Sequence, residues 1–273
     1  MKTILVPTDF SEEANQSSEY AFRLALKAKS KIVFLHITSI PVDWIRLEHD
    51  QETLYPDISR KVRMIQGRLN ELTDKARSFG IDSESYLHYN AGYGYIVEYA
   101  RRIEADMIIM GSRGIDSISD VFTGSNTQRV VRMSEIPILV ISKPVDQLKK
   151  VALVSDFSPE VNAIINNLAE FIDVLKASFY MVFINTPNAF MDSKEIDERI
   201  HAFKQSWDRP GEIIVYNDHN FEKGIDNLCR RYEIDLIVMA THDRKGLDRF
   251  LLGSLTENVI NHLDNPVLSL HLN

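Results

Sequence analysis

The segment Ala105-Asp106-Met107-Ile108-Ile109-Met110 runs directly into Gly111-Ser112-Arg113-Gly114, and nine residues later the chain reads Gly124-Ser125-Asn126. A similar passage occurs a second time. There, Ile234-Asp235-Leu236-Ile237-Val238-Met239 precedes Ala240-Thr241-His242-Asp243, and nine residues later the chain reads Gly253-Ser254-Leu255. A short apolar run that ends in a loop before a helix is typical of a buried parallel strand. The chain therefore contains two related units, and only the first keeps both glycines of the loop after the strand.

The two units align along their whole length. Thr8-Asp9-Phe10-Ser11 matches Ser155-Asp156-Phe157-Ser158 at an offset of 147, whereas Ile136-Pro137-Ile138-Leu139-Val140 matches Asn265-Pro266-Val267-Leu268-Ser269 at an offset of 129. The first unit thus carries 18 extra residues between its second and fourth strands, and we expect them at 42–56. A repeat of this length indicates a duplicated domain rather than a solenoid. We expect the domains to span 1–146 and 147–273.

Strands and helices alternate in each unit. Expected strands cover 3–6, 31–37, 83–89, 107–110 and 138–141 in the first unit, with 178–184, 212–216, 234–239 and 267–270 among those of the second. Expected helices cover 11–29, 57–79, 93–103, 193–207 and 221–232, and Ser158 and Pro159 have the character of an N-cap and a first helical residue. This alternation predicts an α/β fold with two tandem open parallel five-stranded sheets, Rossmann-like, with helices on both faces.

Composition narrows the class of protein. The 273 residues are 44% apolar and 26% charged, as in globular domains, and no apolar run reaches the about 18 residues that would span a bilayer. The net charge is −8, divided as −2 before residue 147 and −6 after it, so nucleic acid and membrane are not expected partners. A single cysteine, Cys229, excludes an internal disulfide and suits a reducing compartment, so we expect a cytoplasmic protein.

The loop after the fourth strand of the first unit has the features of an anion site. Gly111 and Gly114 would let the backbone wrap a phosphate, and Gly124-Ser125-Asn126-Thr127 opens a helix whose free N–H groups attract anions. Arg113 lies in the loop and can pair with phosphate oxygens. Ligands of open parallel sheets bind beyond the carboxyl ends of the strands. Pro7-Thr8-Asp9 and Met110-Gly111 should therefore flank the crevice, where Asp9 can accept hydrogen bonds from a ribose or base.

Structural roles for these residues remain open alternatives. Ser125 with Gln128, and Ser254 with Glu257, fit the capping box, and Asp9 and Asp156 can cap the first helix of each unit. Arg113 can be a solvated surface charge. The histidines His36, His88 and His242 have no spacing typical of a metal site. Cys229 lies beside Arg230 and Arg231, but a buried helix position explains it best.

The second unit departs from this pattern. It has Ala240 and Asp243 in place of the two loop glycines, and an aspartate aimed into a phosphate pocket repels the ligand. We expect no triphosphate binding there, or much weaker binding.

These motifs resemble the universal stress protein family over essentially the whole chain, as a tandem pair. The match lies in Pro7-Thr8-Asp9-Phe10-Ser11, in Gly111-x2-Gly114-x9-Gly124-Ser125 and in Ile136–Val140, with echoes in the second unit. The resemblance implies an adenine nucleotide alpha hydrolase-like fold and ATP as ligand, with or without Mg, with AMP or ADP as alternatives. It implies adenosine contacts from Pro7, Thr8, Asp9 and Ile37, and phosphate contacts from Gly111, Ser112, Arg113, Gly114, Gly124, Ser125 and Asn126. Met110 and Thr127 complete the expected nucleotide-binding residues. It also implies pairing of the fifth strands, here within one chain, and a homodimer is compatible with it.

The first functional hypothesis is a cytoplasmic stress-response protein that binds ATP as a regulatory ligand. The chain lacks a Walker A lysine motif, and no general base or nucleophile is visible near the loop, so we expect at most slow hydrolysis. The alternative is an interaction scaffold that binds no nucleotide. A nucleotide-transferring enzyme would need an additional substrate pocket, for which the sequence shows no signal.

Overall fold

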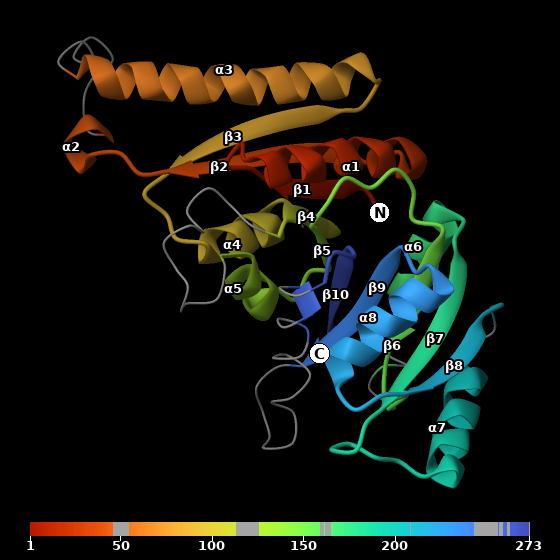
Figure 1. The fold of residues 1–273 in the computed structure, drawn as a ribbon. Coiled ribbons are helices and arrows are strands. Elements are labelled where there is room, and N and C mark those ends of the chain that lie inside the picture. The colour runs from red at the N-terminus through yellow and green to blue at the C-terminus, as the bar shows by residue number, and fades with distance from the viewer. Residues whose placement is uncertain are drawn as a thin grey trace.

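The computed structural model describes residues 1–45, 55–112, 126–158, 161, 165–207, 209–242, 256, 259–260 and 263–272. Ten strands form one sheet in the order β3-β2-β1-β4-β5-β10-β9-β6-β7-β8, and helices cover both of its faces (Figure 1). All neighbouring strands are parallel except β5 and β10. The predicted α/β class with two tandem parallel five-stranded units is confirmed, and the two units share a single continuous sheet.

The first unit contains the strands β1 (Thr3–Pro7), β2 (Lys31–Thr38), β3 (Ser83–Tyr89), β4 (Met107–Gly111) and β5 (Ile138–Ile141). Its helices are α1 (Glu12–Ala28), α2 (Val42–Ile45), α3 (Pro56–Ser78), α4 (Gly94–Arg102) and α5 (Asn126–Met133).

The second unit contains the strands β6 (Lys150–Val154), β7 (Ser178–Asn185), β8 (Glu212–Asn217), β9 (Leu236–His242) and β10 (Val267–Leu272). Its described helices are α6 (Ile165–Leu175), α7 (Ser193–Ser206) and α8 (Phe221–Tyr232). Pro159 lies outside the described residues, so the expected start of the first helix of this unit stays a prediction.

The position of the 18 extra residues was only partly predicted. The offset is 147 for β1 and β2 against β6 and β7, and 129 for the last three strands, so the insertion falls between β2 and β3. It is not confined to 42–56, because α3 has 23 residues whereas its counterpart α7 has 14. The longer helix and the preceding connection share a small apolar cluster of their own, formed by Ile40, Trp44 and Val62.

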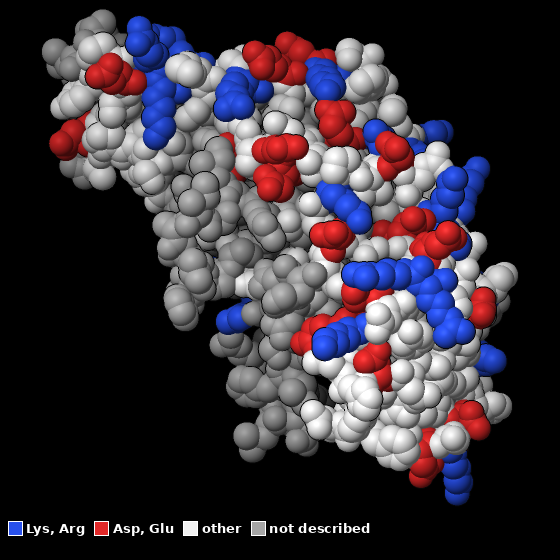
Figure 2. Space-filling view, in the orientation of Figure 1, with Lys and Arg blue, Asp and Glu red and all other residues white. Residues whose placement is uncertain are grey.

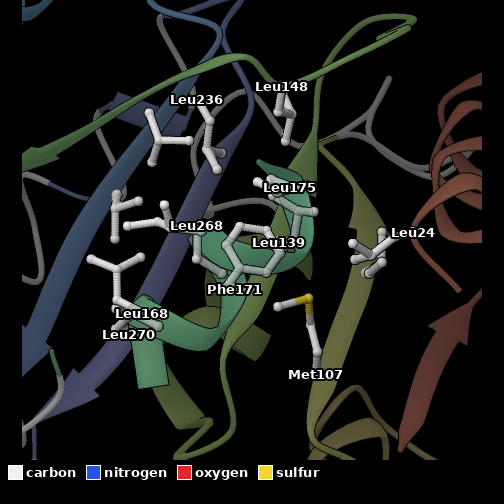
Figure 3. Packing of buried hydrophobic residues seen from close by; sticks show 14 of the residues in the cluster. Leu24, Met107, Leu139, Leu148, Leu168, Phe171, Leu175, Leu236, Leu268 and Leu270 are labelled. Carbon is white, nitrogen blue, oxygen red and sulfur yellow. The ribbon is translucent and has the colours of Figure 1, made fainter. Parts of the chain in front are cut away.

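The two faces of the sheet carry separate hydrophobic cores. One core packs α1, α3, α6 and α7 on the sheet and includes the fully buried Phe34 and Phe203. The other packs α4, α5 and α8 on the opposite face. Both run through the centre of the sheet: the first contains Leu139 of β5 and Leu268 of β10, which are 0% and 1% exposed (Figure 3), and the second contains Val140 and Val267.

The antiparallel pairing of β5 with β10 joins the units. Val140, Leu139 and Ile138 lie opposite Val267, Leu268 and Ser269. The predicted meeting of the fifth strands within one chain is therefore confirmed. Each strand covers the edge that the other would expose, which removes two sites for aggregation.

The end of β4 lies against the first turn of α1. A Cβ atom added at Gly111 would come within 2.8 Å of the Glu13 backbone carbonyl carbon and 2.9 Å of the Glu13 Cβ. No side chain fits at that separation without moving the helix. A glycine at this position is therefore needed for close packing of strand and helix.

Gly111→Ala is expected to lower the free energy of unfolding by about 1–3 kcal/mol, because the extra methyl group overpacks this contact. Urea unfolding followed by circular dichroism measures the change. Gly67→Ala is the matched control: Gly67 lies in the interior of α3 with nothing within 4 Å of its added Cβ. It should raise the stability by about 0.5–1 kcal/mol through helix propensity. Equal effects of the two substitutions would contradict the close-packing role of Gly111.

Candidate functional site

The turn that follows β1 is held by its own side chains. The Phe10 N–H donates to Thr8 Oγ1 at 3.0 Å, and the Ser11 N–H donates to Asp9 Oδ1 at 2.9 Å. Ser11 caps α1 by accepting the Ala14 N–H at 3.2 Å. Phe10 has a φ of 63°, an unusual value for a bulky residue, so the surrounding contacts must hold it there.

The same turn occurs after β6. The Phe157 N–H donates to Ser155 Oγ at 2.9 Å, the Ser158 N–H donates to Asp156 Oδ1 at 3.0 Å, and Phe157 has a φ of 55°. Asp9 and Asp156 thus have an identical structural role in holding the turn. The cap of α1 is Ser11 and not Asp9, so the alternative that Asp9 caps the helix is wrong, and a ligand role for Asp9 stays a prediction.

His36 and Arg68 pack behind the first turn. The His36 ring stacks on Phe10 with centroids 4.7 Å apart, and its Nδ1 lies 2.7 Å from the Thr8 carbonyl oxygen. Burial lowers the pKa of His36, so the ring is neutral near pH 7 and Nδ1 carries the proton that Thr8 accepts. The Arg68 guanidinium lies 4.4 Å from the Phe10 ring centroid. These contacts explain how Phe10 keeps its left-handed backbone.

A pocket of about 140 Å³ lies at the carboxyl ends of β1, β2 and β4. Its walls bring together eight residues predicted as a site: Pro7, Thr8, Asp9, Ile37, Met110, Gly111, Asn126 and Thr127. They come from three strands and from the start of α5. The remaining lining is mostly apolar, which is typical of a small-molecule pocket with a few polar groups.

Four residues of the pocket escaped the sequence analysis, namely Ala14, Leu35, Tyr93 and Ile96. Tyr93 directly precedes α4, shortly after the end of β3. Since parallel strands end at a common edge, the residues that follow β3 are candidates for this crevice, and that rule alone could have identified Tyr93.

The end of β4 is joined to α5. Thr127 Oγ1 donates to the Gly111 carbonyl at 2.9 Å, which fixes the helix start beside the strand. The Ser112 N–H donates to the Ile141 carbonyl at 3.0 Å, and Ser112 is not among the pocket-lining residues. Gly111 does not have a positive φ. Its role in the structure is the close approach to α1.

Several predicted site residues lie outside the described part of the chain. They are Arg113, Gly114, Gly124 and Ser125 in the first unit, with Asp243, Gly253 and Ser254 in the second. The capping box of Ser125 with Gln128 and that of Ser254 with Glu257 lie partly outside it as well.

The corresponding positions of the second unit carry larger or acidic side chains. Val161 replaces Ala14 and Ala240 replaces Gly111, and both are buried. Glu222 replaces Tyr93. Arg199 lies 3.5 Å from the Asp156 carboxylate and donates to the Asp156 carbonyl at 3.2 Å. The second unit therefore has bulkier side chains at two of the pocket positions and an acid at a third, and its aspartate is paired with an arginine.

Other candidate groups have structural roles. Burial raises the pKa of the Cys229 thiol to about 12, which confirms an unreactive position in α8. His88 stacks on Tyr95 with centroids 3.7 Å apart. Within the described ranges there is no group of three or more histidine, cysteine or acidic residues that could hold a metal, and no helix long and apolar enough to cross a membrane. Acidic and basic residues are interspersed on the face in Figure 2.

The chain was compared with known proteins. The model of the universal stress protein family matches residues 1–142 and 149–271. The universal stress protein Slr1230 of Synechocystis is 24% identical over 298 residues, which cover 98% of this chain and 99% of the relative. The crystal structure of a universal stress protein from Archaeoglobus fulgidus superposes with a TM-score of 0.75 at 18% identity, covering 99% of this chain and 98% of the other.

A further structure describes a universal stress protein in complex with cAMP, which is 22% identical and covers 52% of this chain with a TM-score of 0.39. The family model matches the chain twice, and each match covers one of the two five-stranded units. The chain therefore belongs to the universal stress protein family, as a member with two tandem units.

Proposed function

We propose that the first unit binds an adenine nucleotide, ATP or a related compound, as a regulatory ligand of a cytoplasmic stress-response protein. The observation that supports this most is the pocket at the carboxyl ends of β1 and β4, where the glycine-bearing loop begins. The apolar walls formed by Ile37, Ile96 and Met110 suit a flat base. The polar groups of Thr8, Asp9 and Asn126 suit a ribose.

The phosphates would extend toward the segment that follows Gly111. Gly114, Gly124 and Ser125 would supply backbone N–H groups there, and α5 begins at Asn126 with its positive dipole end. Arg113 would neutralise part of the charge. In this role the nucleotide orders the loop and shifts the populations of two conformations, without a chemical step.

The second unit is expected to bind nucleotide weakly or not at all. Val161 and Ala240 are larger than Ala14 and Gly111, and Glu222 and Asp243 replace the uncharged Tyr93 and Gly114, so the second unit has less space and more negative charge at these sequence positions. Asp156, the residue equivalent to Asp9, also forms an ion pair with Arg199.

The main experiment measures thermal unfolding with ATP, ADP, AMP and cAMP, each with and without Mg²⁺. Ligand at about 100 times its dissociation constant should stabilise the protein by roughly 2.7 kcal/mol. Gly114→Asp, which copies Asp243 into the first loop, should abolish the shift without lowering the melting temperature of the free protein. Asp243→Gly is the matched control in the second unit, and it should not create a second site because Val161, Ala240 and Glu222 remain.

A protein that shows no shift with any of the four nucleotides would contradict the proposal and favour the scaffold hypothesis. Normal ATP binding by Gly114→Asp would refute the assignment of the loop to the phosphates.

A second prediction concerns Tyr93. Tyr93→Glu copies Glu222 into the first pocket and should weaken ATP binding by about tenfold at low salt through charge repulsion, with a smaller effect at high salt. Tyr93→Gln has nearly the same shape without the charge, so it isolates the electrostatic effect. Isothermal titration calorimetry at two ionic strengths compares them. If both variants lose the same affinity for ATP regardless of salt, charge repulsion does not explain the weak binding expected of the second unit.

A further inference from the structure

The junction between the two units has an approximate twofold symmetry that extends to individual side chains. Asp106 accepts the Thr3 N–H at 2.8 Å, and its equivalent Asp235 accepts the Lys150 N–H at 2.9 Å. Each fifth strand is preceded by a proline, Pro137 or Pro266. The symmetry implies two equivalent grooves on the face that carries α1 and α6, one on each side of the paired strands.

The connection between the units covers one groove. Leu148 is 1% exposed, and Val145 packs against the hydrophobic core on this face. Arg23 of α1 donates to the Val145 carbonyl and forms an ion pair with Asp146 at 2.9 Å. An extended segment with an apolar residue followed by an acid therefore occupies this position.

The equivalent groove lies between Met1 and α6. It forms a pocket of about 200 Å³, hereafter the open groove, lined on its apolar side by Met1, Met107, Phe171, Val174 and Leu270. These residues correspond to Leu148, Leu236, Leu24, Lys27 and Ile141 of the covered groove. In Figure 3 Met107 lies close to Phe171, and Leu270 lies beside Leu168.

The two grooves differ in charge at one decisive position. Glu170, which lines the open groove, corresponds to Arg23 of the covered groove. A segment that binds in the open groove as Val145 and Asp146 bind beside α1 would place the residue equivalent to Asp146 next to the Glu170 carboxylate, where the covered groove has the Arg23 guanidinium. That position therefore selects a basic residue and disfavours an acidic one.

We propose that the open groove is a docking site for an extended segment of a partner protein that carries a valine or leucine followed by lysine or arginine. The apolar side chain packs against the core in the open groove as Val145 packs against the core beside α1, and the basic residue pairs with Glu170. The covered groove is the template for this mode of binding. The proposal is independent of nucleotide binding.

The test uses two fluorescein-labelled peptides and the full chain. One peptide is Ser-Lys-Pro-Val-Asp-Gln-Leu, the sequence of residues 142–148, and the other has lysine in place of the aspartate. Fluorescence anisotropy should show saturable binding of the basic peptide below about 1 mM. The acidic peptide should bind about two- to fivefold more weakly, the range of an exposed ion pair.

Three variants locate the site. Glu170→Arg should reverse the preference of the protein for the two peptides, whereas Glu71→Arg, on the exposed face of α3, should leave it unchanged. Val174→Trp should fill the groove and remove binding of both peptides, and circular dichroism checks that it folds. Absence of saturable binding by the basic peptide, or the same peptide preference in wild type and Glu170→Arg, would overturn the proposal.

Discussion

The antiparallel pairing of β5 with β10 is the interaction on which the rest of the molecule depends. It joins two parallel five-stranded units into one sheet and buries Leu139 and Leu268 at the centre. Because the pairing is antiparallel, the strands of the two units run in opposite directions. The carboxyl ends of their strands therefore lie at opposite edges of the sheet.

In both units the same side-chain hydrogen bonds hold the turn after the first strand, but the residues around that turn differ. Thr8 with Asp9 and Ser155 with Asp156 make the same hydrogen bonds, so this part of the motif belongs to the fold. The differences lie in the walls: Val161, Ala240 and Glu222 replace smaller or uncharged side chains, and Arg199 pairs with Asp156. Retention of a motif is therefore poor evidence for retention of a ligand when the same atoms also stabilise the backbone.

Duplication also accounts for the asymmetry of the junction. Two equivalent grooves flank the paired strands, and the connection of residues 142–149 can cover only one of them. The covered groove shows how an extended segment is accommodated, with Val145 against the core and Asp146 paired with Arg23. The open groove keeps the apolar lining and exchanges the arginine for Glu170. A partner segment with a basic residue where the connection has Asp146 would therefore complement the charge of Glu170.

The sequence by itself determined the duplication, the strand and helix alternation and the parallel sheets. The spans of β3 (Ser83–Tyr89), β5 (Ile138–Ile141) and α8 (Phe221–Tyr232) agree with the prediction to the residue, because hydrophobic periodicity and capping are local properties of the chain. Only the tertiary structure decided that Gly111 is required by the approach of α1 and that His36 and Arg68 support Phe10. It also decided how the extra residues divide between a longer α3 and its preceding connection. These features depend on contacts between residues distant in sequence, and no local pattern encodes which distant side chains meet.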